Sequence, residues 1–375
     1  MYSDLERNEI FLKAKESAPI YNNDDLMFYY ALNKDLFTLY GTGIKEKNTY
    51  YRFSNEDINN IAKVSADVSF LATHSAGIKL RFKTNLRIIR IRVLENGIHD
   101  MRNMNFMAQC GFDLYSKEDG DKKFIYQNTS FPNYIDNKKY IADIGLYNDK
   151  KERDILIHFP LYCGVIYLEI GLEKDAIVKP SFYENEGKIV CYGTSILQGG
   201  CVSRPGLNIT NVLSRTFSKD IINYGFSGAG LMELEVAEII NKIDDIDLLI
   251  IDAEANAGCD KWMYENFDIF LNVFYKKYPN LPIIIMNKTQ MAIDYQFEKN
   301  KLLKEFYDDF LINKVKEYQD KGKNIIFINN YNLFDIYKNN FAECTVDGVH
   351  PNDLGMYLLT NNYIKAIKQI TNKNY

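Results

Sequence analysis

The second half of the chain alternates short apolar runs with longer helical stretches, and this pattern constrains the fold more than any other feature. Each run is followed by a loop and then by a helical pattern, and the runs occupy residues 188–192, 220–224, 247–252, 283–287 and 324–328. Alternation of this kind is typical of parallel strands that are covered by helices on both faces. We therefore predict a three-layer α/β/α domain over residues 186–375.

The first half has a different pattern, in which apolar and polar residues alternate with a period of two. The alternation is clearest in residues 78–83 and 89–93, and further candidate strands lie at residues 112–115, 124–127, 154–159 and 164–170. Short runs of this kind separated by turns predict antiparallel strands in an all-β, jelly-roll-like sandwich. Residues 175–187 lose the periodicity and contain Pro180. We place a domain boundary there, with the sandwich over residues 1–185.

Length and composition set further limits on the chain. With 375 residues it is long for one core, which favours two domains, and 46% hydrophobic residues are enough to bury both. The net charge is −5 and the cationic residues are scattered, so we expect no nucleic-acid partner and a small or neutral ligand instead. A homo-oligomer is compatible with the sequence.

The sequence also bears on location and on metal binding. Residues 1–19 lack a continuous apolar core because charged residues interrupt them, among them Asp4, Glu6, Arg7, Lys13 and Lys15. No run elsewhere approaches the length of a membrane span, so we expect a cytoplasmic protein with no membrane partner. The six cysteines form no Cys-x-x-Cys pair and have no histidine at zinc spacing, so we expect reduced thiols, no metal and no cofactor.

A serine stands where a nucleophile would be expected in such a fold. The first apolar run leads directly into Gly193-Thr194-Ser195-Ile196, which places Ser195 at the carboxyl end of a strand and the start of a helix. A serine hydroxyl becomes a good nucleophile when an imidazole takes its proton and a carboxylate orients that imidazole. Asp347 and His350, three residues apart before the last helical stretch, can supply both groups. We expect structural roles for the other histidines, which are His74, His99 and His158.

Attack by Ser195 on an ester would place negative charge on the carbonyl oxygen, so the site should also contain N–H donors. Three candidates lie in loops that follow the first three predicted strands: the backbone N–H groups of Ser195 and Gly228, and the side-chain amide of Asn256. The carboxyl ends of parallel strands meet at one edge of a sheet, which is where ligands bind in open α/β folds. We therefore expect an oxyanion hole made by Ser195, Gly228 and Asn256.

These residues resemble the four sequence blocks of the SGNH (GDSL-like) hydrolases, which supply Ser, Gly, Asn and His. The matches are Ser195, Gly228, Asn256 and His350, with Asp347 as the acid of the family's Asp-x-x-His block. In addition, the segment 111–115 matches the Gly-x-Asp-Leu-Tyr signature of a domain that precedes some of these esterases. The resemblance implies a flavodoxin-like hydrolase domain and hydrolysis of short acyl esters, acetyl above all, on a carbohydrate or another small polar alcohol.

The chain departs from the family pattern at two positions. Thr194 replaces the usual Asp before the nucleophile, which leaves the role of Ser195 intact. Ala255 stands where a Gly or Pro precedes the Asn, and Glu254 adds a carboxylate beside Asn256. We take Glu254 as a candidate substrate contact, together with Gln198, Arg204 and Asn208 in the loop after the nucleophile.

Two other functions are compatible with parts of the sequence. The glycines of residues 225–230 suggest a dinucleotide-binding loop, but their order is G-x-x-G-x-G and the loop follows the second strand of the domain. A catalytically silent carbohydrate-binding protein would use the sandwich and carry a degenerate hydrolase half. Hydrolysis that depends on Ser195 separates the enzyme from both alternatives.

Overall fold

The computed structural model describes residues 22–44, 48–98, 101–132, 138–337 and 341–371. Residues 1–19, for which the sequence predicts no signal peptide, and His99 lie outside these ranges. Across the described ranges, no helix combines the length and the apolar character that a membrane span requires.

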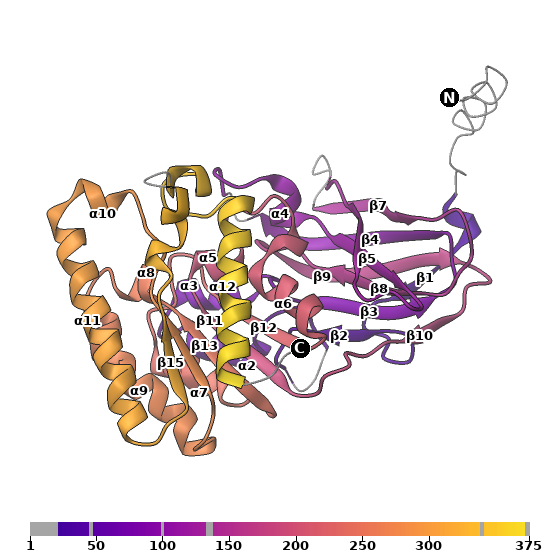
Figure 1. Cartoon of the computed structure of the whole chain (residues 1–375). Helices are drawn as coiled ribbons and strands as arrows, with labels where there is room; N and C mark the ends of the chain where they lie inside the picture. Colours follow the sequence, from indigo (N-terminus) through magenta and orange to yellow (C-terminus); the bar gives the residue numbers. More distant parts are fainter. Residues whose placement is uncertain (1–21, 45–47, 99–100, 133–137, 338–340, 372–375) are drawn as a thin grey trace.

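The N-terminal half contains two antiparallel sheets (Figure 1). The order of the first is β1 (Leu26–Tyr30), β9 (Cys163–Glu173), β4 (Ile88–Ile98) and β7 (Lys139–Leu146). The order of the second is β10 (Val178–Pro180), β3 (Lys79–Thr84), β8 (Arg153–His158), β5 (Asp113–Glu118) and β6 (Ile125–Thr129), and β2 (Thr38–Tyr40) also pairs with β3. The predicted sandwich is thus confirmed, whereas β1, β2, β7 and β10 were not predicted.

Period-two alternation explains why these strands pack as a sandwich. In β3, Leu80 and Phe82 are buried in the core between the sheets, where they meet Ile155 and Ile157 of β8. Burial of each such side chain contributes about 2 kcal/mol to folding. The intervening residues of β3, Arg81 and Lys83, line a cavity outside this core.

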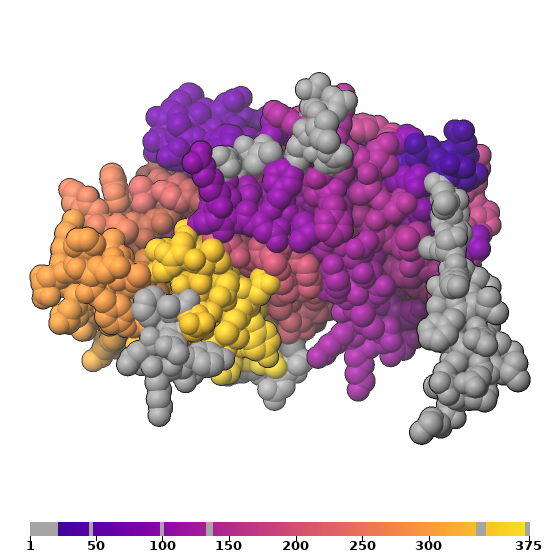
Figure 2. All heavy atoms as spheres, turned by 90° about the horizontal axis from the view of Figure 1, so that it is seen from above, coloured from indigo at the N-terminus to yellow at the C-terminus, as the bar shows by residue number. Residues whose placement is uncertain are grey.

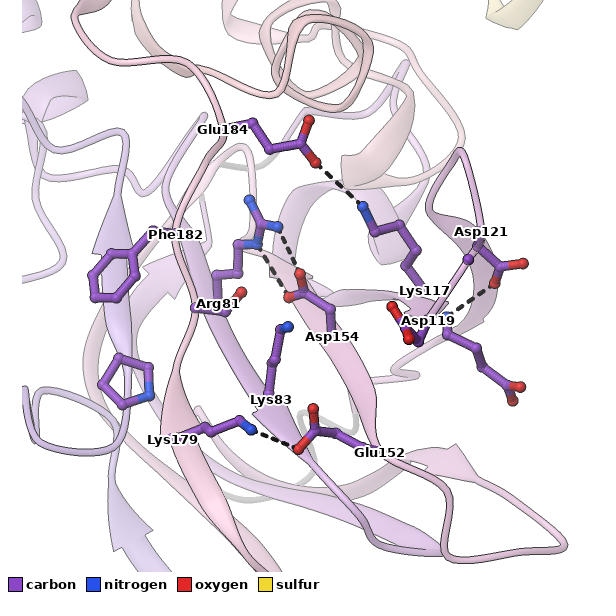
Figure 3. A pocket seen from close by; sticks show the side chains of 14 residues that line it. Arg81, Lys83, Lys117, Asp119, Asp121, Glu152, Asp154, Lys179, Phe182 and Glu184 are labelled. Carbon is purple, nitrogen blue, oxygen red and sulfur yellow. Dashed lines mark hydrogen bonds and ion pairs between the residues drawn. The ribbon is translucent and has the colours of Figure 1, made fainter.

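That cavity has a volume of about 850 Å³ and is shown in Figure 3. Most of its cations pair with neighbouring carboxylates: Arg81 with Asp154 at 2.6 Å, Lys179 with Glu152 at 2.7 Å and Lys117 with Glu184 at 3.4 Å. None of the residues predicted for the active site lines the cavity. We therefore assign it no part in the ester chemistry.

The C-terminal half contains a parallel sheet ordered β12 (Asp220–Gly225), β11 (Lys188–Gly193), β13 (Ile246–Asp252), β14 (Ile283–Met286) and β15 (Ile325–Ile328). The second strand lies outside the first, which is the flavodoxin-like order. The helices are α5 (Ser195–Gln198), α6 (Ile209–Phe217), α7 (Leu234–Ile240), α8 (Glu254–Ala257), α9 (Trp262–Lys277), α10 (Ile293–Gln296), α11 (Glu298–Asp320) and α12 (Asp353–Thr371). The four short 3-10 helices are Asn23–Asp25, Pro205–Leu207, Tyr331–Tyr337 and Phe341–Cys344 in the described chain.

Both faces of this sheet are buried, as the continuous apolar runs predict. In β11, Ile189 and Cys191 face a core that α6 and α12 complete, whereas Val190 and Tyr192 face a core that α7, α9 and α11 complete. The three-layer α/β/α prediction is therefore confirmed.

The two halves share these cores. Helices α2 (Asn55–Ile61) and α3 (Ala66–Ala72) place Ile61 and Leu71 in the core beside α7 and α9. Met104 and Ala108, from the segment around α4 (Phe106–Cys110), lie in the core beside α6 and α12. Figure 2 shows the purple N-terminal part lying directly against the yellow C-terminal part. A boundary near residue 185 stays a prediction, and contacts across it are extensive.

Candidate active site

Ser195 is the first residue of α5, which follows β11 after Thr194, and it is 7% exposed. A glycine on the neighbouring strand allows this turn to be tight. A Cβ atom on Gly225, at the end of β12, would lie 2.2 Å from the backbone nitrogen of Gln198 in α5, which is too close for any other residue. The end of β12 therefore packs directly against the nucleophile helix.

The predicted catalytic residues come together although 155 residues separate Ser195 from His350. Ser195 Oγ lies 2.9 Å from His350 Nε2, and His350 Nδ1 lies 2.8 Å from Asp347 Oδ2. A bridge between Thr345 and Pro351 closes the loop that carries Asp347 and His350. These distances match a serine, a base and an acid that orients the base.

Asp347 is held by four hydrogen bonds. Its Oδ1 accepts from the backbone N–H groups of Val349 at 3.0 Å and His350 at 2.8 Å. Its Oδ2 accepts from His350 Nδ1 and from Asn103 Nδ2 at 2.7 Å. Partial burial raises the pKa of Asp347, but hydrogen bonds from His350 and Asn103 outweigh it and lower the pKa to about 2. The acid is therefore a charged carboxylate at every pH at which the protein would work.

The three predicted oxyanion donors lie in the expected loops. Gly228 is exposed with a φ of +67°, a conformation that favours glycine, and its N–H donates to no acceptor within the described chain. The backbone N–H of Ser195 lies in the first turn of α5, where helix N–H groups have no helical partner. Asn256, on α8, donates through Nδ2 to the carbonyl of Ala229 and, at 3.4 Å, to that of Phe226. Its amide is thus directed at the loop that carries Gly228.

Two of the predicted substrate contacts are buried instead, which corrects the expectation. Gln198 is 0% exposed, and its Nε2 donates to the carbonyl of Leu161 at 3.1 Å and lies 3.2 Å from His74 Nδ1. Its Oε1 accepts from the N–H of Ser227 at 3.0 Å. Asn208 is also 0% exposed and caps α6 by accepting from Thr210. Neither side chain has a free polar group to offer to a substrate.

Arg204 has a different role from the predicted one. Its Nη1 donates to Asp113 Oδ2 at 2.6 Å and to the Tyr115 hydroxyl at 2.7 Å. The same Asp113 oxygen accepts from the backbone N–H of Gly206 at 2.7 Å. Asp113 and Tyr115 belong to the Gly-x-Asp-Leu-Tyr segment, so this motif fastens the loop after the nucleophile helix to the N-terminal sandwich.

Glu254 is also buried, which corrects its prediction as a substrate contact. It is 2% exposed, and its Oε2 accepts from the backbone N–H of Lys288 at 3.0 Å. Burial raises its pKa to about 7, and the Lys288 contacts only partly oppose this. We therefore correct its assignment from a substrate contact to a buried carboxyl group that joins α8 to the loop after β14.

Asp252, at the end of β13, has a similar environment and leads to a stability prediction. Burial raises its pKa to about 7, against the hydrogen bond that the Tyr363 hydroxyl donates to Oδ2 at 2.5 Å. Because the folded-state pKa lies above the unfolded value, the protonated form of Asp252 is the form that favours folding. Its contribution to the free energy of unfolding is complete at about pH 4 and is lost as the pH rises through about 7. In thermal unfolding, Asp252→Asn should therefore raise the melting temperature relative to wild type by a few degrees more at pH 8 than at pH 5. An equal change at both values would contradict the assignment.

Cysteine chemistry and dinucleotide binding find no support in this geometry. Burial and the Asp347 carboxylate raise the pKa of Cys201, the thiol beside the catalytic residues, to about 12, so it stays protonated. A Cβ atom on Gly230 would lie 2.6 Å from the carbonyl oxygen of Gly193. Gly225 and Gly230 are thus required because the loop packs closely against the turn that carries Ser195. The glycines of this loop need no phosphate ligand to explain them. His74 and His158 are 0% exposed, in agreement with structural roles.

Sequence reasoning missed Asn103. It lies between β4 and α4, far from the hydrolase blocks, and 244 residues separate it from Asp347. No periodicity, motif or charge pattern distinguishes it from the other asparagines of the chain. Its proximity to the site becomes visible only when the two halves are packed together.

Comparisons with known proteins agree with this geometry. Residues 186–368 match the GDSL-like lipase/acylhydrolase family, and residues 27–178 match the family described as the N-terminus of SGNH-hydrolase-type esterases, GxDLY. No curated protein matches the chain in sequence. Among solved structures, a protein described as a GDSL-like lipase from Bacteroides ovatus is 29% identical, with a TM-score of 0.83 over 93% of this chain and 99% of that one.

Two further structures share the fold at low identity. The salicylyl-acyltransferase SsfX3 from a tetracycline biosynthetic pathway is 14% identical, with a TM-score of 0.73 over 92% of this chain and 98% of that one. The acetyl xylan esterase Est2A from the rumen bacterium Butyrivibrio proteoclasticus is 11% identical, with a TM-score of 0.55 over the same shares of the two chains. The two family matches and the two-part fold lead to one assignment: residues 186–368 belong to the GDSL-like lipase/acylhydrolase family, residues 27–178 belong to the GxDLY family of esterase N-termini, and the chain is a carboxylic ester hydrolase.

Proposed function

We propose that this enzyme is a serine esterase that removes short acyl groups, acetyl above all, from a carbohydrate or another small polar alcohol through an acyl-Ser195 intermediate. The observation that carries the proposal is the continuous chain of contacts from Ser195 Oγ through His350 to Asp347, at 2.9 and 2.8 Å. Such a chain supplies a nucleophile with a base and an oriented tautomer.

The first half of the reaction forms the acyl-enzyme. Ser195 Oγ attacks the ester carbonyl carbon while its proton passes to His350 Nε2, and Asp347 stabilises the imidazolium ion. The carbonyl oxygen becomes negative and accepts hydrogen bonds from the N–H groups of Ser195 and Gly228. When the tetrahedral intermediate collapses, the carbon–oxygen bond to the alcohol breaks and His350 donates its proton to the departing alkoxide.

The second half returns the free enzyme. A water molecule attacks the acyl carbon, its proton passes to His350 Nε2, and the bond to Ser195 Oγ breaks as His350 returns the proton to it. Asn256 is the third oxyanion donor in this scheme. The hydrogen bond from Asn256 Nδ2 to the Phe226 carbonyl is long, at 3.4 Å. The amide hydrogen in this bond can therefore be donated to the oxyanion instead, because a charged oxygen is a stronger acceptor than a neutral carbonyl.

The substrate class is inferred from a structural neighbour and from the packing of the two halves. The acetyl xylan esterase with the same two-part fold acts, by its name, on an acetylated carbohydrate. In this chain, the packed N-terminal half provides a rigid wall beside the hydrolase domain that could select the alcohol. Remote contacts of this kind affect specificity, so a small activated ester should depend on them less than a glycan ester does.

The proposal is tested with a panel of esters graded in acyl length, on a 4-nitrophenol and on a sugar alcohol, with wild type and Ser195→Ala in parallel. We expect hydrolysis that is fastest for acetyl, falls with acyl length and is lost in the variant. A preference for long acyl chains would overturn the acyl-group assignment. Hydrolysis of the 4-nitrophenyl esters alone, with every sugar ester left intact, would overturn the assignment of the alcohol.

The lowered pKa of Asp347 makes a prediction about pH. Since this carboxylate stays charged above a pH of about 2, its protonation should not contribute to any loss of activity in acid above that value. A plot of log(kcat/KM) for 4-nitrophenyl acetate against pH should therefore have a slope no greater than about one on its acid side. A slope near two would show that Asp347 also takes up a proton in this range.

A further inference from the structure

Asn103 belongs to the N-terminal half, and its side chain contacts the carboxylate of Asp347 directly. Its Nδ2 donates to Asp347 Oδ2 at 2.7 Å, and the same oxygen receives His350 Nδ1 at 2.8 Å. We propose that Asn103 is a positioning residue of the catalytic triad, through which the N-terminal half completes the active site of the hydrolase half. The inference rests on the proposed function of Ser195, His350 and Asp347.

The segment that carries Asn103 is held firmly on both sides. Gln109 accepts from the N–H of Met101 at 3.2 Å and donates to the carbonyls of Met101 at 3.0 Å and Met104 at 2.8 Å. Met104 itself is buried in the core beside α6 and α12. Hydrogen bonds and packing therefore restrain the residues on both sides of Asn103.

The following segment is anchored as well. Helix α4 leads directly into β5, where Asp113 accepts from Arg204 and from the N–H of Gly206. The motif that fastens the two halves thus lies ten residues after Asn103 in the same stretch of chain. This arrangement gives the sandwich a direct part in catalysis, in addition to any contact with the substrate.

The chemistry of the contact fits a positioning role. Asp347 Oδ2 accepts from both Asn103 Nδ2 and His350 Nδ1, so the Asn103 amide restrains the oxygen that orients His350. The amide is neutral, so it holds the carboxylate without competing for the proton on His350. The Cys201 thiol, whose sulfur lies within 4.8 Å of ligand atoms of Asp347 and His350, stays protonated.

The test compares two variants of the full chain with 4-nitrophenyl acetate. Asn103→Leu removes the donor at similar size and should lower kcat about tenfold while KM changes less than twofold, as expected for loss of a hydrogen bond to a charged group. Asn103→Asp replaces the donor with a second negative charge beside Asp347. This charge favours the imidazolium form of His350, so the acid limb of the kcat/KM profile should move to higher pH by about 0.5 unit or more.

The matched control is Asn105→Asp, which introduces the same charge two residues away. Asn105 is exposed and caps α4 by accepting from the N–H of Met107 at 2.8 Å, and aspartate caps equally well. We expect wild-type kcat and an unshifted acid limb. A pH-independent loss of folded protein lowers kcat without moving that limb, and the limb is compared only over the pH range in which each variant stays folded.

Unchanged kcat in Asn103→Leu, an unshifted limb in Asn103→Asp, or an equal shift in Asn105→Asp would overturn the positioning role. These outcomes leave the proposed function intact as long as wild-type hydrolysis is lost in Ser195→Ala. Hydrolysis that persists in Ser195→Ala would instead remove the proposed function, and the role of Asn103 with it.

Discussion

Replacing Ser195 with alanine should lower kcat for 4-nitrophenyl acetate by about 10⁶-fold, because no other group in the site can form the acyl intermediate. The nearest thiol, Cys201, stays protonated, so it cannot substitute for the serine. Steady-state assays of purified variants measure the effect. His350→Ala should cost nearly as much, since the hydroxyl then loses its base and the two groups act as a unit.

Ser203→Ala is the matched control for this experiment. Ser203 lies in the loop after the nucleophile helix, and its backbone N–H donates to Asp353 at 2.8 Å, a contact that alanine keeps. We expect activity close to wild type. If Ser203→Ala and Ser195→Ala lost activity equally, the effect would be one of folding and not of nucleophilicity.

Asn256→Ala should lower kcat by about 10² to 10³-fold with little change in KM, because an oxyanion donor acts mainly once charge has developed. The assay uses the same acetate ester, with a melting curve for each variant, since the substitution also removes the contacts to Ala229 and Phe226. A variant that keeps more than about a third of wild-type kcat would show that backbone N–H groups alone form the oxyanion hole.

Asn266→Ala controls for the lost loop contact. The Asn266 amide also donates to a carbonyl of the segment between β12 and α7, that of Leu231 at 3.3 Å. Its substitution should reduce stability without a comparable loss of kcat. Equal losses in both variants would mean that Asn256 acts by holding the loop and not by donating to the oxyanion.

Much of the fold can be predicted from the sequence because the faces of a strand that are buried determine the spacing of apolar residues along it. The runs in the second half are continuous because both faces of the parallel sheet are covered, as Ile189 and Val190 show by facing different cores. Strand β7, by contrast, was missed because its exposed residues include apolar side chains such as Ile141 and Leu146, which obscure the alternation.

The proximity of Ser195, Asp347 and His350 could also be predicted, since strand ends in a parallel sheet meet at one edge. The side chains that contact the substrate could not be predicted in this way. Arg204 and Gln198 were chosen because they follow the nucleophile, but their partners, Asp113 and Leu161, lie in the other half of the chain. Whether a polar side chain faces solvent or a distant partner depends on how the two halves pack, which local patterns do not encode.

Covalent labelling tests the central claim most directly. Wild-type enzyme is incubated with a serine-directed phosphonate, digested and analysed by mass spectrometry, with Ser195→Ala treated in parallel. We predict one added phosphonyl group on the peptide that contains Ser195, loss of activity in proportion to labelling, and no label in the variant. A label on a cysteine, or full hydrolytic activity with Ser195 unlabelled, would contradict the assignment of Ser195 as the nucleophile.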